Sequence, residues 1–307
     1  MTNKGRTNIA ASIRQRLLNR ARERREPFDL VLTQYALERL LYRLSRSPHR
    51  GDFVVKGATL LQVWTELPHR PTRDLDLLGR GTESINRLES AFREICGQAA
   101  GVEDGIEFDP ETVRGSEIRE RQEYRGVRLT LTAHLGNARI PLQIDVGFGD
   151  VVTEGPIETE FPTLLDLPAP VLPAYSRESV VSEKYQALVD LGMANTRMKD
   201  FFDLYVLSGG FTFHGPALAE AIRATFRRRG SALPGEIPTG LSDEFARTKR
   251  MQWAAFLGKA KLEGAPEDLE DVVVRLREFL LPPTAALRSG DTFDRVWTPN
   301  GPWSLPR

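Results

Sequence analysis

The segment from residue 53 to residue 78, FVVKGATLLQVWTELPHRPTRDLDLL, constrains the fold more than any other part of the chain. It begins with an apolar run typical of a buried strand and passes through Gly57 into a helical pattern, Ala58 to Glu66. It ends where leucines alternate with Asp74 and Asp76. Because successive side chains of a strand point to opposite faces, this alternation predicts a second strand with both carboxylates on one face.

Two carboxylates on one face repel each other and require a nearby cation. Mg²⁺ prefers oxygen ligands in proteins, and we therefore interpret Asp74 and Asp76 as a platform for a metal ion. The chain holds 17 Asp among 307 residues, so about one Asp-x-Asp pair arises by chance. The interpretation thus depends on further candidates elsewhere in the chain.

A candidate third ligand lies on a predicted hairpin. Alternating apolar residues over 127–135 and 138–148 predict two strands, and Gly136-Asn137 predicts the turn between them. Asp145 is an acid on the polar face of the second strand, where it would complete a site of three carboxylates. Its alternative role is a solvent-facing or turn-capping acid, and Asp150 is a second candidate for the third ligand.

The first fifty residues are strongly basic, although the formal net charge of the whole chain is zero. They hold twelve Lys or Arg against four acids, and their apolar spacing predicts helices over Ile9 to Arg25 and Leu30 to Leu44. Such a surface either faces water or contacts phosphates. The same two interpretations apply to Arg223 with Arg227 to Arg229.

The cellular compartment is predicted from what the sequence lacks. The single cysteine, Cys96, excludes an internal disulfide and a site built from several cysteines. The first residues show no signal-peptide pattern, and no run of about 18 apolar residues could span a bilayer. We therefore expect a cytoplasmic protein without a membrane partner.

The composition changes beyond residue 160, where four prolines within twelve residues predict an extended connector. Helical patterns follow. We expect four parts: basic helices packed on the core (1–50), the core (51–160), a helical C-terminal domain that contributes to the site (161–290) and an irregular tail (291–307).

Two predicted helices of the second half carry charged candidates. Lys184 lies at the edge of the apolar face of a helix that begins at Ser176, which is the usual place of a solvent-facing lysine. Asp200 and Asp203 are three residues apart and share one face of the next helix. Beside Arg197 they are typical of a structural ion-pair cluster or of a functional site.

Together these residues resemble one known family. The ordered set is Lys56-Gly57-Ala58, Thr72-x-Asp74-x-Asp76, an acid on a later strand, Glu183-Lys184-x-x-Ala187, and Arg197-x-Lys199-Asp200-x-x-Asp203-Leu204. This succession, over about residues 30 to 210, is similar to that of the AbiEii nucleotidyltransferase-like toxins of abortive-infection toxin–antitoxin systems.

The resemblance implies an α/β (α+β) fold with a polymerase-beta-like nucleotidyltransferase core, a mixed sheet, and a helical C-terminal domain. It implies an enzyme that uses an NTP as substrate and one or two Mg²⁺ ions, with Asp74, Asp76 and Asp145 as metal ligands. Where a polymerase-beta-like site usually opens with Gly-Ser or Gly-Gly, this chain has Gly57-Ala58, which leaves Thr59 as the nearest side-chain hydroxyl.

The resemblance also assigns the remaining candidates to the nucleotide. Lys184 would bind the β- and γ-phosphates as a point charge, and Asp203 would orient Lys184 or an acceptor group. The nucleotide-binding set further includes Lys56, Gly57 and Thr72, and the secondary candidates are Asp200 and Arg197.

The implied acceptor is RNA, particularly the tRNA 3′ end, so that nucleotide addition blocks translation in a phage-defence system. The second implied partner is a cognate antitoxin encoded nearby. Two rival interpretations remain at this point. One is a nucleotidyltransferase that modifies a small molecule of the aminoglycoside type, and the other is a non-catalytic binding module that retains the fold.

Overall fold

The computed structural model describes residues 3–65, 72–119, 125–260, 262 and 265–306. The chain divides into two compact units. Unit 1 comprises Met1–Trp64, Pro71–Gly149 and Ile157–Ala174, and unit 2 comprises Thr65–Arg70, Asp150–Pro156 and Tyr175–Arg307. The proline-rich connector predicted after residue 160 therefore falls in unit 1 up to Ala174.

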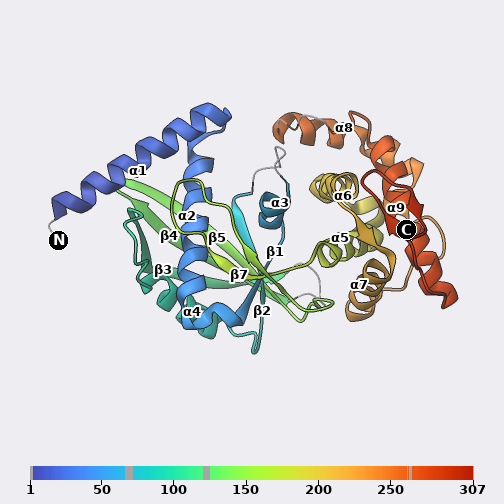
Figure 1. Ribbon diagram of the computed structural model, residues 1–307, viewed down its shortest axis with the longest axis horizontal. Coiled ribbons are helices and arrows are strands. Elements are labelled where there is room, and N and C mark those ends of the chain that lie inside the picture. The colour runs from blue at the N-terminus through green and yellow to red at the C-terminus, as the bar shows by residue number, and fades with distance from the viewer. Residues whose placement is uncertain (1–2, 66–71, 120–124, 261, 263–264, 307) are drawn as a thin grey trace. The chain divides into compact units, whose positions relative to one another are not determined.

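Unit 1 contains a seven-stranded mixed sheet in the order β3-β4-β5-β2-β1-β7-β6 (Figure 1). Strands β2 and β5 pair in parallel, as do β1 and β7, whereas the other neighbours are antiparallel. This confirms the mixed sheet implied by the resemblance. The elements are α1 (Asn3–Arg24), α2 (Phe28–Arg46), β1 (Phe53–Lys56), α3 (Thr59–Trp64), β2 (Asp74–Gly79), α4 (Ile85–Gly97), β3 (Ile106–Arg119), β4 (Arg125–Leu135), β5 (Ala138–Phe148), β6 (Ile157–Glu160) and β7 (Val171–Ala174).

The two faces of this sheet differ in polarity because apolar and polar residues alternate along β2 and β5. Leu75, Leu77, Ile144 and Val146 are buried, and α2 and α4 cover this apolar face (Figure 1). The broad apolar stripe of residues 30–44 makes α2 suited to that position. The opposite face of β2 and β5 carries the carboxylates.

The predicted segments from residue 53 to 79 form as expected, with one difference in length. Strand β1, the glycine turn, α3 and β2 follow one another in the predicted order. Helix α3 ends at Trp64, and Glu66, the predicted last residue of that helix, lies outside the described residues.

Strands β3 and β7 were not predicted from the sequence pattern. In β3 the pairing with β4 shifts between Asp109 and Arg114, and this irregularity breaks the alternation by which a strand is identified. Strand β7 lies in the segment predicted as an extended connector, and Ala174 pairs with Val55 of β1. Four residues that include Pro173 are too few to show a period.

Unit 2 is predominantly helical, as predicted, with a small three-stranded sheet in the order β10-β9-β8. Its helices and strands are α5 (Arg177–Leu191), α6 (Met198–Gly210), β8 (Phe213–His214), α7 (Gly215–Arg228), α8 (Asp243–Ala260), α9 (Leu269–Ser289), β9 (Val296–Trp297) and β10 (Trp303–Ser304). Ser176 caps α5 as expected, because its hydroxyl accepts a hydrogen bond from the backbone N–H of Ser179 at 3.2 Å.

The tail after residue 290 is more ordered than the sequence pattern indicates. Trp297 of β9 is fully buried, and its indole N–H donates to the carbonyl of Ser208 at 2.7 Å. Trp303 of β10 packs against Phe279 and donates to its carbonyl at 3.0 Å. Strands of two residues are too short to be predicted from alternation, so the two tryptophans were the only sequence feature that indicated an ordered tail.

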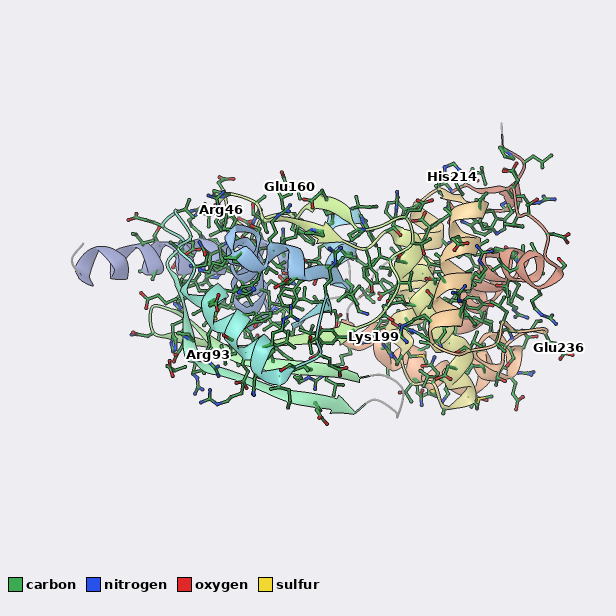
Figure 2. The ribbon with its side chains drawn as sticks, turned by 90° about the horizontal axis from the view of Figure 1, so that it is seen from below. Arg46, Arg93, Glu160, Lys199, His214 and Glu236 are labelled. Atoms are coloured by element: carbon green, nitrogen blue, oxygen red, sulfur yellow. The ribbon has the colours of Figure 1, made fainter. Side chains whose placement is uncertain are left out.

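Exposed polar side chains include Arg46 and Glu160 of unit 1 and His214 and Glu236 of unit 2 (Figure 2). Among the described residues, none of the helices combines the length and apolar character needed to cross a membrane.

Candidate functional site

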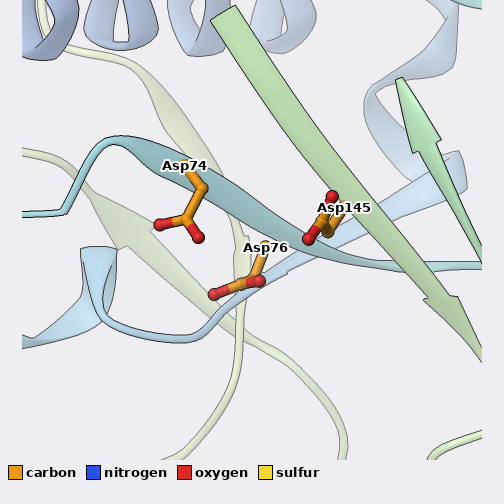
Figure 3. Close-up of side chains that lie close together, drawn as sticks. All are labelled: Asp74, Asp76 and Asp145. Atoms are coloured by element: carbon orange, nitrogen blue, oxygen red, sulfur yellow. The ribbon is translucent and has the colours of Figure 1, made fainter. Parts of the chain in front are cut away.

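Three carboxylates converge on the polar face of the sheet in unit 1. Asp74 and Asp76 alternate with leucines along β2, and the parallel pairing of β2 with β5 places Asp145 directly beside Asp76. One oxygen from each carboxylate lies within 4.8 Å of the other two (Figure 3). All three side chains are half-buried. The structure thus brings together the three residues that the sequence analysis named as metal ligands.

This group has the chemistry of a divalent metal site. Its donors are carboxylate oxygens, which hard divalent cations prefer, and three negative charges so close together repel one another. The donor set therefore fits a divalent cation.

Gly57 is required by the close approach of the backbone to Asp76. Its φ is +75°, and a Cβ atom added there would lie 2.0 Å from Oδ2 of Asp76. No other residue type fits this position without moving the carboxylate. The glycine turn therefore belongs to the carboxylate group, while its contact with a nucleotide stays a prediction.

The other predicted residues around the carboxylates have defined positions. The buried hydroxyl of Thr72 donates to Oδ1 of Asp74, so Thr72 fixes the orientation of that carboxylate. Lys56 stands opposite Asp76 in the β1–β2 register. Thr59 begins α3 and lines, with Thr72 and Glu38, a small open pocket.

Arg128 of β4 is a member of this group that the sequence analysis missed. Its Nε donates to Oδ1 of Asp145 at 2.8 Å and its Nη2 donates to Oδ2 at 2.7 Å. The two residues are direct cross-strand partners. The two-residue turn at Gly136-Asn137 could have revealed this pair, because counting outwards from the turn brings residue 128 opposite residue 145.

A second charged cluster lies inside unit 2. The Nζ atom of Lys184 on α5 is 2.7 Å from Oδ1 of Asp200 and 2.7 Å from Oδ2 of Asp203, both on α6. Arg197 contacts the other oxygen of Asp200 at 2.9 Å. Lys184 is only 12% exposed, and both aspartates are buried. The alternative of a solvent-facing Lys184 is therefore wrong.

Opposing effects act on the acidity of Asp200. Burial works to raise the pKa of its carboxyl, but Lys184 and Arg197 outweigh burial and hold that pKa below its ordinary value. Asp200 is therefore ionised at neutral pH, and the cluster holds two cations against two anions.

Asp150, the alternative third ligand, has described contacts within unit 2. It belongs to unit 2, where Nη2 of Arg229 lies 3.5 Å from its Oδ1 and 3.3 Å from Oε2 of Glu183. Arg229 also donates to Oε1 of Gln186 at 2.8 Å. Arg229 thus binds acids and an amide of its own unit, whereas Arg223, Arg227 and Arg228 are exposed, and their contact with phosphate stays a prediction.

The basic side chains of the first fifty residues are also only partly exposed. Arg39 is fully buried, and Arg43 forms a buried ion pair with Asp104 at 2.8 Å. On α1, by contrast, Ala10, Ile13, Leu17 and Ala21 are buried, while the exposed side chains include Arg14, Arg16, Arg22 and Arg24. The exposed basic charge therefore concentrates on α1.

Two solved structures resemble the chain, each at 16% sequence identity. The match with JHP933 from Helicobacter pylori covers 85% of this chain and 94% of JHP933, with a TM-score of 0.44. The match with an H. pylori protein described as a candidate nucleotidyltransferase covers 86% of this chain and 98% of that protein, with a TM-score of 0.45. A search of curated proteins found no match.

A family model matches residues 39–275, which is well over half of the chain and includes both charged clusters. The description of that model is nucleotidyl transferase AbiEii toxin of type IV toxin–antitoxin systems. The chain therefore belongs to the AbiEii family of nucleotidyl transferase toxins.

Proposed function

We propose that this nucleotidyltransferase uses Mg²⁺ to transfer an NMP group from an NTP to a hydroxyl of an RNA acceptor, the 3′ end of tRNA, with release of pyrophosphate, and thereby blocks translation in the cytoplasm. The observation that carries the proposal is the group formed by Asp74, Asp76 and Asp145, whose oxygens lie within 4.8 Å of one another. The family implies a cognate antitoxin, and phage defence is the biological role that fits such a pair.

Residues of unit 1 would bind the metal ion and hold its ligands in place. A bound Mg²⁺ neutralises a triphosphate and activates an attacking hydroxyl. Asp74, Asp76 and Asp145 would hold it through their carboxylate oxygens, and Thr72 would keep Asp74 in place through the hydroxyl that it already donates. Gly57 would leave space for Asp76.

Lys184 would bind the β- and γ-phosphates of the nucleotide. Its ammonium group has three donors, and Asp200 and Asp203 accept from it on one side. Asp203 would act by orienting Lys184, and Arg197 would keep Asp200 ionised. Asp200 and Arg197 are thus supporting residues of the phosphate end.

The acceptor in this proposal is RNA because of the charge on α1. Its exposed arginines, which include Arg14, Arg16, Arg22 and Arg24, form a surface suited to a phosphate backbone. A small aminoglycoside is itself cationic, and such a surface would repel it.

The test is a transfer assay with purified full-length protein. Each labelled NTP is incubated in turn with Mg²⁺ and either total tRNA or an aminoglycoside, and Asp74→Asn is compared with Asp166→Asn, which removes an exposed acid elsewhere in unit 1. We expect label on tRNA with the wild type and with Asp166→Asn but not with Asp74→Asn. Labelled aminoglycoside would contradict the RNA acceptor, and equal labelling by Asp74→Asn would contradict the metal site.

A further inference from the structure

Four charged residues form a row across four adjacent strands of unit 1. Lys56 of β1 stands opposite Asp76 of β2, Asp76 lies beside Asp145 of β5, and Asp145 stands opposite Arg128 of β4. Directly paired residues point to the same face of a sheet. The row therefore reads cation, acid, acid, cation, with Arg128 at its outer end.

The contact between Arg128 and Asp145 is a fork rather than a loose ion pair. Two donors of one guanidinium engage both oxygens of the carboxylate, at 2.8 and 2.7 Å. Such a fork fixes the plane of the carboxylate as well as its distance. The side chains are 40% and 19% exposed, respectively, so water competes with the fork mainly on the arginine side.

The fork leaves Asp145 with capacity to bind a cation. A carboxylate has about four lone-pair positions, and the two donors of Arg128 use two of them. Nε2 of Gln143 also lies 3.4 and 3.3 Å from the two oxygens of Asp145, and with that amide turned over its oxygen accepts from Arg128 instead. A cation bound near Asp74 and Asp76 would occupy a remaining position, because one oxygen of Asp145 lies within 4.8 Å of theirs.

We propose that Arg128 is a positioning residue that holds Asp145 in the orientation required of a third metal ligand. This inference rests on the proposed metal site. The competing explanation is that Arg128 is only a counter-charge that reduces repulsion among the three carboxylates.

The two explanations predict opposite changes in the cation affinity of an Arg128 variant. Removing a positive charge a few ångströms from a bound cation removes repulsion, so a pure counter-charge role predicts tighter cation binding by an Arg128 variant. Removing the fork frees Asp145 to rotate, so a positioning role predicts weaker binding. Arg128→Lys separates the two further, since it keeps the charge but cannot form the fork.

The experiment measures Mn²⁺ binding by electron paramagnetic resonance on the full chain without nucleotide. The variants are Arg128→Gln and Arg128→Lys, and the matched control is Arg139→Gln. Arg139 is an exposed arginine on β5 that lies six residues from Asp145 on the same face, which is about 20 Å along a strand. We expect both Arg128 variants to bind Mn²⁺ roughly 10- to 100-fold more weakly than the wild type and the control to match the wild type.

Each outcome separates this inference from the proposed function. If the wild type binds Mn²⁺ and Arg128→Gln binds it equally or more tightly, Arg128 is not a positioning residue, and the metal site stands. If the wild type does not bind Mn²⁺, or Asp74→Asn binds it as tightly as the wild type, the metal site itself is refuted. Circular dichroism checks the fold of each variant, and should Arg128→Gln fail to fold, the affinity of Arg128→Lys decides.

Discussion

Replacing Gly57 by Ala tests whether the close approach of the backbone to Asp76 holds the carboxylate group together. The added Cβ would lie 2.0 Å from Oδ2, 2.7 Å from Cγ and 2.8 Å from Cβ of Asp76. The carboxylate oxygen must retreat by about 1.4 Å to reach the 3.4 Å of an ordinary contact. That shift is large for a group whose three oxygens lie within 4.8 Å of one another.

The free-energy cost has two parts. A side chain at φ +75° costs about 1 to 2 kcal/mol, and forced repacking at a crowded position costs about 1 to 3 kcal/mol. We therefore expect Gly57→Ala to lower the free energy of unfolding by about 2 to 5 kcal/mol. We also expect it to weaken Mn²⁺ binding at least tenfold, since Asp76 no longer faces its partners.

The matched control is Gly51→Ala. Gly51 lies just before β1, and an added Cβ there meets no atom within 4 Å, so the variant should change stability by no more than about 0.5 kcal/mol. Urea unfolding and Mn²⁺ titration measure both effects. If Gly57→Ala matches Gly51→Ala in stability and in affinity, the proposed contact between the turn and Asp76 does not govern the site.

Three further predictions concern other groups. Burial raises the pKa of Glu38 to about 7 despite the neighbouring Arg39, so its folded-state pKa exceeds the unfolded value of 4.5. Between pH 4.5 and 7 the free energy of unfolding of the wild type should therefore fall by about 3 kcal/mol relative to that of Glu38→Gln. If the unfolding free energies of the two proteins change in parallel over this pH range, the raised pKa of Glu38 is contradicted. Asp203→Asn should abolish nucleotide transfer and lower the free energy of thermal unfolding by about 3 kcal/mol, because a buried ion pair loses one partner. If the variant keeps wild-type activity, Asp203 does not orient Lys184. Replacing Arg16 and Arg22 by Gln should reduce the slope of log K for tRNA against log salt by roughly 1 to 2, and an unchanged slope would exclude α1 from the interface.

The carboxylate group was predictable because its signals are local. Period-2 alternation identifies β2 and β5 and places Asp74, Asp76 and Asp145 on polar faces. The two-residue turn fixes the β4–β5 register and would have identified Arg128. What no local pattern contains is the parallel pairing of β2 with β5, which is the contact that brings Asp145 beside Asp76.

Charge counting failed where packing decides the environment of a side chain. The excess of arginines in the first fifty residues predicted one basic surface, but Arg43 is buried against Asp104, which lies sixty-one residues away in the sequence. Lys184 shows the same limit. Its position on α5 is that of a solvent-facing lysine. The family resemblance suggests Asp203 as its partner, and the packing of α5 on α6 adds Asp200.

The charge balance of the two clusters differs, and the difference matches their proposed roles. In unit 1 the carboxylates of Asp74, Asp76 and Asp145 outnumber the two cations that flank them in the sheet, so a negative charge remains to attract a divalent cation. In unit 2, Lys184 and Arg197 balance Asp200 and Asp203, so a free cation gains little there. A phosphate that binds Lys184 would therefore have to add to these contacts rather than replace them, because a displaced aspartate would be left buried without its cation.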